Sequence, residues 1–365
     1  MPDDLSIQSH KGAYPVHFDS DLLLRPDCLL EGDNHYLIDA NIARLYSDTL
    51  GSIVGSSRAR IIEATEDSKS IQGIVSIMEG LVADKVRRGH TLVAIGGGII
   101  QDITCFIASV LMRGVPWSFV PTTLLAQADS CIGSKSSINL GLSKNILGTY
   151  YPPKAIWICE SFLDTLAPSD MRSGLGEILK IHAIDSIEAF ERLASVYDQL
   201  LTDRRELLKS LRESLRIKQR FIETDEFDQG PRLLLNYGHS FGHAIESTTR
   251  FAIPHGIAVT MGMDIANAVS VGRGLFPATH AQRMHSTLRK NYEAFENIPI
   301  PIDGLLDALM KDKKNTGTRL VLILPKGERA RLERTEVIAD DVFRAQCEQA
   351  LARTTRFNRD AMKQS

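Results

Sequence analysis

The stretch TLVAIGGGIIQDITCFIASVLMRGVPWSFVPTT, residues 91–123, constrains the fold more than any other part of the chain. Residues 91–98 have the pattern of a buried strand that runs into glycines, residues 99–114 that of a helix, and residues 117–126 that of a strand and a turn. A strand, a helix and a strand in this order predict a βαβ unit and therefore a parallel sheet.

The rest of the chain predicts a second domain of a different kind. The sequence has 365 residues, more than one hydrophobic core usually supports. Short strand-like runs dominate the first half, whereas long amphipathic helices dominate after about residue 160. We expect an α/β fold with a Rossmann-like, parallel-sheet domain over residues 1–165 and a mainly α-helical domain over residues 166–365. The further elements expected are strands at 35–40, 59–64 and 319–327 and helices at 70–89 and 210–226.

Composition excludes several classes of protein. The chain is 43% hydrophobic and 24% charged with a net charge of −3, as in ordinary globular enzymes, and it lacks the basic tract of a nucleic-acid binder. No run of about 18 apolar residues predicts a membrane span, and the N-terminal residues have no apolar signal core, so we expect a cytoplasmic protein. The cysteines are odd in number and lack CxxC spacing, which predicts reduced core thiols at Cys28, Cys105, Cys131, Cys159 and Cys347.

The glycines at 96–98 predict either a phosphate-binding turn or a simple tight turn. They follow a strand and open a helix, where glycine lets the backbone approach a diphosphate and the helix N-terminus supplies amide donors. The full GxGxxG pattern is absent, because position 101 is Gln. The segment PTT at 121–123 adds threonine hydroxyls at the end of the next strand, and in open α/β sheets ligands sit at the carboxyl ends of strands.

Residues 128–145 are polar and contain glycine, although they lie between apolar segments. This stretch contains Asp129, Lys135, Lys144 and Asn145, which suit an anionic, hydroxylated ligand. A solvated surface loop is an equally good interpretation of such a composition, and we expect a loop here.

A second group of charged residues lies in the predicted helix 174–184. Glu177 and Lys180 are three residues apart and share one helix face, which is typical of a surface ion pair. Their neighbours are apolar on several sides, so the pair is expected to lie in the interior, where charges need partners or a metal.

Three histidines follow within 17 residues. His239 and His243 are four apart, on one face of a helix if the segment is helical, and His255 comes after a proline. A single histidine on an apolar face usually only packs, but three with a buried glutamate predict a three-ligand catalytic zinc site. The zinc-peptidase motif HExxH does not fit, because position 240 is Ser.

Together these segments resemble the dehydroquinate synthase family of sugar phosphate cyclases over roughly residues 35–330. The resemblance is carried by GGGIIQD (96–102), MRGVPWSFVPTTLLAQADSCIGSK (112–135), KNILGTYYPP (144–153), GLGEILK (174–180), RLLLNYGHSFGHAIES (232–247) and PHGIAVTMGM (254–263).

The resemblance implies NAD in the first domain, a divalent metal (zinc or cobalt) in the second, and a small sugar phosphate substrate between the two. It implies the metal ligands Glu177, His239 and His255, with His243 beside the substrate phosphate. The other active-site positions that it implies are Asp129, Lys135, Lys144, Asn145, Lys180, Lys218, Arg232, Asn236 and a lysine of the turn at 312–314, most simply Lys313. The implied NAD contacts are Asp39, Glu66, Lys69, Gly97, Gly98, Asp102, Thr122, Thr123, Leu125, Lys144, Thr165 and Leu166. Arg113 matches an arginine that reaches into the partner's site, which implies a homodimer.

The reaction implied by the resemblance is a redox-neutral cyclisation. A ring hydroxyl is oxidised, phosphate leaves by β-elimination, the hydride returns, and an intramolecular aldol step closes a carbocycle, so the enzyme is a phosphate-eliminating carbon–oxygen lyase. Arg232 suits a carboxylate, because arginine binds that group with two parallel hydrogen bonds. This favours 3-deoxy-arabino-heptulosonate 7-phosphate as substrate and 3-dehydroquinate as product.

Three alternatives stay open. A related cyclase would act on sedoheptulose 7-phosphate or another sugar phosphate such as glucose 6-phosphate, and the departures from the family pattern at Gln101 and Ser134, both glycine in most relatives, lie near the cofactor and substrate loops. An NAD-dependent metal alcohol dehydrogenase would not need the cluster of lysines and Arg232. A non-catalytic relative would have lost metal ligands or Asp129, and both are present.

Overall fold

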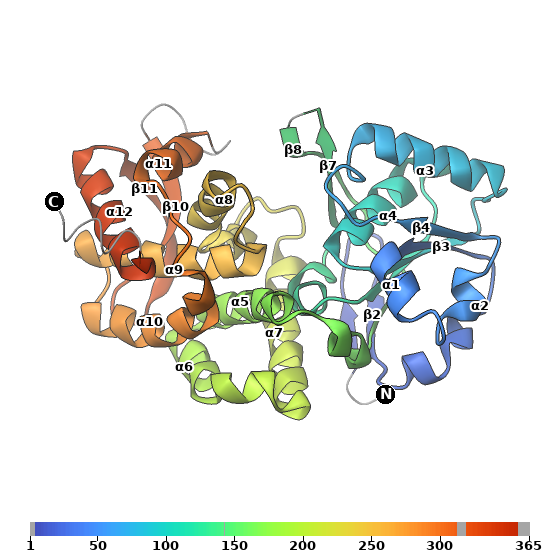
Figure 1. The fold of residues 1–365 in the computed structure, drawn as a ribbon, viewed down its shortest axis with the longest axis horizontal. Helices are drawn as coiled ribbons and strands as arrows, with labels where there is room; N and C mark the ends of the chain where they lie inside the picture. The colour runs from blue at the N-terminus through green and yellow to red at the C-terminus, as the bar shows by residue number, and fades with distance from the viewer. Residues whose placement is uncertain (1–3, 142, 312–318, 357–365) are drawn as a thin grey trace. The chain divides into compact units, whose positions relative to one another are not determined.

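The computed structural model describes residues 4–141, 143–311 and 319–356 (Figure 1). The chain divides into two compact units. The first unit comprises Met1–Ala167 and Lys218–Asp228, and the second comprises Pro168–Ile217 and Gln229–Ser365. The segment Lys218–Asp228, which the sequence analysis assigned to the helical domain, thus belongs to the first unit.

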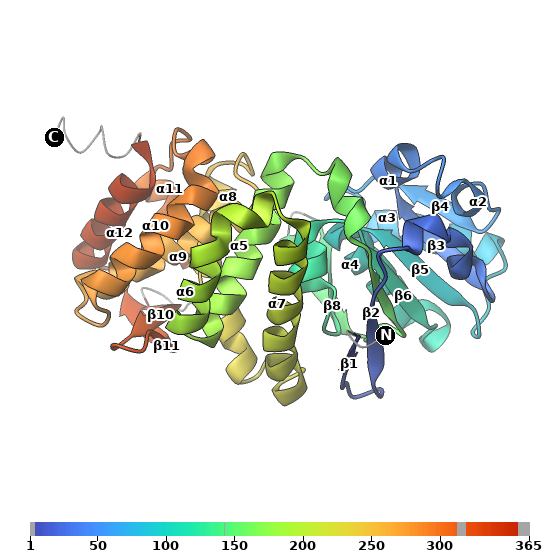
Figure 2. The same ribbon diagram turned by 90° about the horizontal axis from the view of Figure 1, so that it is seen from below.

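The first unit is built on a seven-stranded sheet in which only the edge strand β1 is antiparallel to its neighbour. The strand order is β1-β2-β9-β6-β5-β3-β4, and Figure 2 shows the strands side by side. The parallel sheet expected from the βαβ pattern is confirmed. The strands are β1 (Leu5–Ile7), β2 (Tyr14–Phe18), β3 (Asn34–Asp39), β4 (Ala59–Ile62), β5 (Thr91–Gly96), β6 (Trp117–Pro121) and β9 (Ile156–Ile158).

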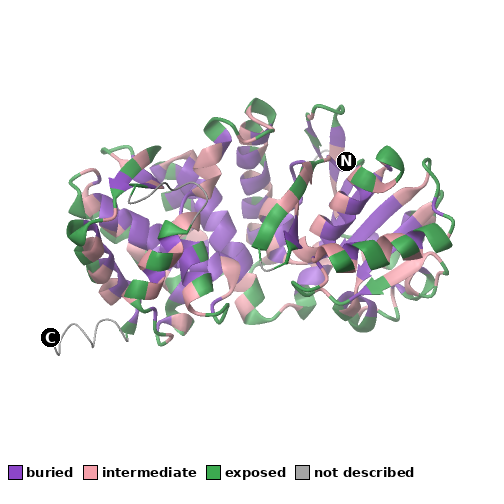
Figure 3. Ribbon diagram, turned by 90° about the horizontal axis from the view of Figure 1, so that it is seen from above, coloured by how far each residue is buried: buried purple, intermediate pink, exposed green. Residues whose placement is uncertain are grey.

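Central strands of this sheet are buried on both faces, as expected for parallel strands covered by helices (Figure 3). One face of the sheet carries Tyr36, Ile38, Val93 and Ile95 into a core with side chains of α1 and α2. The helices of the first unit are α1 (Ala40–Leu45), α2 (Gly51–Val54), α3 (Ile71–Ala83), α4 (Gly98–Val110) and the short helices η1 (Leu22–Leu24), η2 (Pro26–Leu30), η3 (Leu111–Arg113), η4 (Ala126–Ser130) and η5 (Glu160–Thr165).

The polar stretch 128–145 is not a plain loop, so that expectation was wrong. It begins inside η4, a single π-helical turn, and continues into a hairpin of β7 (Lys135–Leu140) and β8 (Ser143–Tyr150). The hairpin needs Gly148, because a Cβ there would lie 2.2 Å from the carbonyl oxygen of Ser136. Alternation of polar and apolar residues is weak in β8, whose residues are mostly exposed, so the strand gives no clear pattern.

The second unit is mainly helical, with a two-stranded sheet of β10 (Arg319–Lys326) and β11 (Arg331–Ile338). Helices α5 (Pro168–Asp185) and α9 (His255–Gly272) are buried over most of their length, as helices that are apolar on all sides usually are. The others are α6 (Ile187–Val196), α7 (Arg204–Thr224, whose residues from Lys218 on belong to the first unit), α8 (His239–Thr248), α10 (Ala278–Tyr292), α11 (Ile302–Met310), α12 (Asp341–Thr354) and the short η6 (Tyr197–Leu201), η7 (Pro231–Asn236) and η8 (Glu293–Phe295).

Several bounds differ from those expected. The helix predicted at 99–114 ends at Val110, and the helix predicted at 70–89 ends at Ala83. Four of the cysteines are buried free thiols as expected, but Cys28 is exposed. Among the helices of the described ranges, none combines the length and the apolar character that crossing a membrane requires.

Candidate active site

The carboxyl ends of three neighbouring strands of the first unit bring together predicted NAD contacts. Asp39 ends β3, Gly97 follows β5 as the N-cap of α4, and Thr123 follows β6. A Cβ on Gly97 would lie 3.1 Å from a side-chain atom of Thr123, and one on Gly96 would lie 3.2 Å from Asp39. In the sheet, β4 lies on one side of β3 and β5 lies on the other, so the strand order reverses between β3 and β5. In open α/β sheets, nucleotides bind at the carboxyl ends of the strands at such a reversal.

Lys69 is the centre of a second group in the first unit. Its ammonium, although the residue is only 5% exposed, donates to Oδ2 of Asp102 (2.8 Å) and to Oδ1 of Asn145 (3.0 Å). Burial raises the pKa of the Asp102 carboxyl, and the nearby charge of Lys69 opposes that rise. The structure thus joins three predicted site residues that are up to 76 positions apart in the chain.

Two residues that the sequence analysis did not select complete this network. Asn139 donates through Nδ2 to the carboxylate of Glu66 (2.9 Å), and its Oδ1 accepts from the backbone amide of Asn145 (2.9 Å). Ser137 donates from its amide and its hydroxyl to Asp102. Both lie in β7 between predicted residues, and the spacing of a hairpin could have selected them had β7 been recognised.

The polar stretch contributes a third group with Lys218. Nζ of Lys218 lies 2.6 Å from Oδ1 of Asp129 and donates to the carbonyl oxygen of Asp129 (2.5 Å). Lys135, at the start of β7, pairs through Nζ with Oδ2 of Asp228 (2.5 Å). Asp228 is a further residue that the sequence analysis missed.

The other predicted residues of the first unit lie in or next to β6, α4, β8 and the short helices η3, η4 and η5. Lys144 is exposed on β8, with Nζ 3.9 Å from the carboxylate of Glu66. Arg113 is exposed and has a left-handed backbone (φ 66°). Thr122 is buried directly after β6, Gly98 is the first residue of α4, Leu125 precedes η4, Thr165 places Oγ1 3.1 Å from the Tyr46 hydroxyl, and Leu166 follows it.

In the second unit, Glu177 and Lys180 form an ion pair inside α5. Their side chains are 1% and 2% exposed, which confirms the expectation that the pair lies in the interior. Burying two charges is costly unless both are compensated, so a fully buried pair inside a predicted site is a candidate for function rather than for stability alone.

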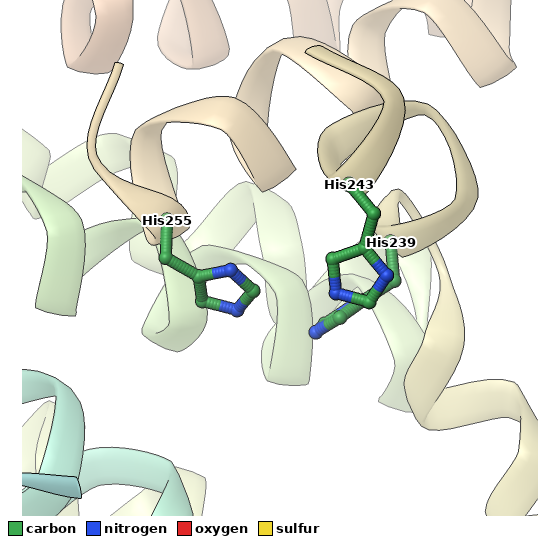
Figure 4. A group of neighbouring side chains, drawn as sticks. All are labelled: His239, His243 and His255. Atoms are coloured by element: carbon green, nitrogen blue, oxygen red, sulfur yellow. The ribbon is translucent and has the colours of Figure 1, made fainter. Parts of the chain in front are cut away.

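The three histidines come together close to this pair. His239 and His243 project from α8 and His255 from the start of α9, and Figure 4 shows their rings turned toward a common space. Their ring nitrogens that could bind a metal all lie within 4.8 Å of one another. Oε1 of Glu177 lies 3.9 Å from Nε2 of His239 and 3.6 Å from Nε2 of His255.

These distances fit a divalent cation. Two ligand atoms that each lie about 2.1 Å from a tetrahedral ion are about 3.4 Å apart, close to the separations between Glu177 and the two histidines. The donor set, one carboxylate and two or three imidazoles, is the kind that zinc prefers in catalytic sites. His243 meets the same distance test as His239 and His255, so geometry alone does not exclude it from the ligand set.

Glu246, a buried residue that sequence reasoning missed, orients one of these histidines. Both of its carboxylate oxygens lie 3.2 Å from Nδ1 of His255, and this contact keeps a proton on Nδ1 and the lone pair on Nε2. Burial alone would lower the pKa of His255, but the hydrogen bond to Glu246 and the charges of Glu177 and Glu246 outweigh it and raise the pKa. The sequence signal for Glu246 was its position three residues after His243, on the same helix.

Arg232 and Asn236 belong to η7, the short helix before α8. Arg232 is 5% exposed, and Asn236 donates through Nδ2 to the carbonyl oxygen of Leu233 (3.0 Å). The predicted lysine of the 312–314 turn, Lys313, lies outside the described residues.

Family models match most of the chain. Residues 59–173 match the model described as 3-dehydroquinate synthase N-terminal, and residues 174–315 match 3-dehydroquinate synthase C-terminal. The 3-dehydroquinate synthase of Campylobacter curvus is 34% identical over 343 residues, which cover 93% of this chain and 97% of that protein. The 3-dehydroquinate synthase of Dictyoglomus turgidum is 33% identical over 343 residues, 93% of this chain and 95% of its own.

Solved structures with the same fold include two cyclases. A 2-deoxy-scyllo-inosose synthase complexed with carbaglucose-6-phosphate, NAD+ and Co2+ superposes with a TM-score of 0.80 at 22% identity, covering 94% of this chain and 99% of that one. The 2-epi-5-epi-valiolone synthase of Streptomyces hygroscopicus with NAD+ and Zn2+ bound gives 0.78 at 25% identity, covering 93% and 95%. The fold, the matched models and the extent of the sequence identity lead to one conclusion: this chain belongs to the 3-dehydroquinate synthase family.

Proposed function

We propose that this protein is a phosphate-eliminating carbon–oxygen lyase that converts 3-deoxy-arabino-heptulosonate 7-phosphate to 3-dehydroquinate and phosphate. The observation that carries the proposal is the donor set of Glu177, His239 and His255, beside a fully buried Lys180, in a chain of this family. Relatives named 3-dehydroquinate synthase match it over nearly its whole length.

Glu177, His239 and His255 would hold the metal, with Glu246 fixing the tautomer of His255. A divalent cation bound there would supply Lewis acidity and lower the pKa of a substrate hydroxyl. Lys180, paired with Glu177, would keep a positive charge next to the developing oxyanion.

The edge formed by Asp39, Gly97 and Thr123 would hold NAD, which supplies a hydride acceptor and donor. Gly97 and Gly98 leave room for a diphosphate at the N-terminus of α4, where unpaired amides and the helix dipole favour anions. Lys69 and Asp102, which form a salt bridge with each other, would supply further contacts to NAD.

The charged groups of each unit suit a polyanionic substrate. In the first unit, Lys135 and Lys144 are cations of the β7–β8 hairpin, Asn145 offers an amide, and Lys218 binds Asp129 in η4. In the second unit, the buried guanidinium of Arg232 suits a carboxylate, Asn236 would orient a hydroxyl, and His243 would hold or accept a proton at the phosphate. Asp129, paired with Lys218, would orient the substrate hydroxyls.

A homodimer in which Arg113 completes the partner's site is part of the same proposal. The arginine is exposed. Its backbone is left-handed and lies at the end of η3, in a tight turn directly before Gly114. Sedimentation analysis of the wild-type protein and mixed dimers of Arg113→Ala with Lys218→Met would test it, because only such mixed dimers could restore one intact site. Failure of the mixture to regain activity would remove Arg113 from the partner's site.

A second candidate is a cyclase of the same fold that acts on sedoheptulose 7-phosphate or another sugar phosphate without a carboxylate. Ser134 favours it, because this buried residue directly precedes Lys135 and departs from the family pattern that the resemblance implies. The two cyclase structures of the same fold are from enzymes named for cyclitol products.

Phosphate release separates the two candidates. The protein, loaded with zinc and NAD, is given 3-deoxy-arabino-heptulosonate 7-phosphate, sedoheptulose 7-phosphate and glucose 6-phosphate in separate reactions. We expect turnover with the first alone, and an increase in KM of about 100-fold or more for Arg232→Met, because a bidentate, charge-assisted contact would be lost. Turnover with a neutral sugar phosphate alone would overturn the choice of substrate.

A further inference from the structure

We propose that Gln101 is a positioning residue that fixes the turn carrying Asp129. The inference rests on the proposed function, since it assigns Asp129 a role in orienting substrate. Gln101 lies one turn into α4 and is 5% exposed.

Gln101 binds Ser130 with both ends of its carboxamide. Nε2 donates to the carbonyl oxygen of Ser130 (2.5 Å), and Oε1 accepts from the hydroxyl of Ser130 (2.6 Å). Two hydrogen bonds between the same pair of residues fix distance and orientation together. They also satisfy a carbonyl at the end of a helical turn, where the helix itself provides no donor.

Ser130 directly follows Asp129 in η4, the π-helical turn Ala126–Ser130. Single π-helical turns occur frequently at functional sites and are less favourable than an α-helical turn, so such a turn needs support from outside. Lys218 binds the carboxylate and the carbonyl oxygen of Asp129, while Gln101 binds the next residue. The turn is therefore fixed at two successive residues from two different helices, α7 and α4.

The neighbouring residue of α4 extends the same arrangement. Asp102 accepts from the amide and hydroxyl of Ser137, seven residues beyond Ser130. Adjacent positions 101 and 102 of one helix thus bind both ends of the segment 130–137, which contains Lys135. With glycine at position 101, the end of this segment at Ser130 would lose both hydrogen bonds to α4.

The test compares Gln101→Leu with a matched control on the same helix. Leu keeps the approximate size of the side chain but removes both hydrogen bonds to Ser130. Thr104→Val is the control, because Thr104 is fully buried in α4 and its hydroxyl bonds only to the carbonyl oxygen of Ile100. Ser130→Ala is a milder second variant, which removes one of the two bonds and serves if Gln101→Leu does not fold.

Hydrogen exchange provides a readout that does not depend on activity. We expect amide exchange in peptides covering 126–137 to accelerate about tenfold or more in Gln101→Leu, less in Ser130→Ala, and not in Thr104→Val. Equal protection of this segment in wild type and both Gln101→Leu and Ser130→Ala would overturn the inference.

Kinetics then separate positioning from packing. We expect kcat of phosphate release to fall about 10- to 100-fold in Gln101→Leu with KM changed less than about threefold, because a misplaced orienting group mainly loses transition-state contacts. In an Asp129→Asn background the same change should cost less than about twofold, since the group it positions is already impaired. If Gln101→Leu lowered kcat by the same factor in the Asp129→Asn background as in the wild type, action through Asp129 would be refuted. If the wild type releases no phosphate from any sugar phosphate, the proposed function fails while hydrogen exchange still decides whether Gln101 holds the turn.

Discussion

Replacing Lys69 with Met should destabilise the first unit in a pH-dependent way. The ammonium is almost wholly buried and donates to Asp102 at 2.8 Å and to Asn145 at 3.0 Å. Methionine has a similar length, so the change removes the charge and both hydrogen bonds with little loss of volume.

The size of the effect follows from the geometry. Two unit charges 2.8 Å apart attract by about 6 kcal/mol at an effective dielectric constant of about 20, and part of this is offset by the desolvation of both groups. Breaking a fully buried pair costs about 3–5 kcal/mol, and Asp102, which is 21% exposed, regains some solvent. We therefore expect a loss of about 2–3 kcal/mol at pH 7.

The sign of the pH dependence follows from Asp102. Burial raises the pKa of its carboxyl above the ordinary value, so the folded state binds a proton more tightly than the unfolded state. Stability therefore rises as pH falls through the window between the raised pKa and the ordinary pKa. Removing Lys69 takes away the charge that opposes the rise, and the window extends to higher pH. The destabilisation by Lys69→Met should therefore be largest near pH 7 and smaller near pH 5.

Tryptophan fluorescence during urea denaturation measures this effect in the right place, because both tryptophans, Trp117 and Trp157, belong to the first unit. The control is the double variant Lys69→Met with Asp102→Asn, which removes both charges and should recover about 1–2 kcal/mol relative to the single variant. If Lys69→Met lowered the free energy of unfolding by less than about 0.5 kcal/mol at pH 7, or by more as pH falls, the stabilising role of the Lys69–Asp102 ion pair would be refuted.

Three further changes have defined outcomes. Glu246→Gln should weaken zinc binding about 10- to 100-fold in a chelator competition, because the histidine it orients loses its carboxylate partner. Gly148→Ala should cost the first unit about 1–3 kcal/mol in the tryptophan assay, because the added Cβ meets a main-chain oxygen of β7 at 2.2 Å. Burial alone would raise the pKa of Glu296, but hydrogen bonds and charges of Arg289 and Arg356 lower it, so its contribution is present at neutral pH and is lost in acid. Glu296→Gln should accordingly cost about 2 kcal/mol at pH 7 by circular dichroism in urea, and much less near pH 3.

Each of these has a matched control. Ser247→Ala is the exposed neighbour of Glu246 on α8, Gly51→Ala adds a Cβ where no atom lies within 4 Å, and Glu293→Gln removes an exposed carboxylate near Glu296. Controls that changed as much as the test variants would show that zinc affinity or stability responds to any substitution in these elements, and the assigned contacts would then be wrong.

The parallel sheet was predictable because its strands are short apolar runs, and strands buried on both faces carry their own signal. The β7–β8 hairpin was not, because most residues of β8 are exposed and its sequence does not alternate. Its position depends on contacts with other elements, such as the hydrogen bonds that Ser137 donates to Asp102 of α4. Tertiary contacts of this kind cannot be predicted from local periodicity.

Part of the candidate site could likewise be predicted from the sequence, and part could not. His239, His243 and their spacing on one helix follow from the sequence, as does the burial of Glu177 and Lys180 among apolar neighbours. Asp129 and Lys218 were each implied by the resemblance, but their pairing across 89 residues became known only from the structure. The sequence did not indicate a role for Glu246, because a glutamate near the end of a helix is usually only a surface charge.

Elimination of phosphate from a sugar phosphate without net oxidation can be tested in a single reaction. Phosphate and the absorbance of NADH are measured in one reaction with 3-deoxy-arabino-heptulosonate 7-phosphate, the zinc-loaded protein and a stoichiometric amount of NAD. We expect many molecules of phosphate to be released per active site with no accumulation of NADH. NADH formed in step with substrate consumed, with no phosphate released, would contradict it and indicate a metal-dependent alcohol dehydrogenase.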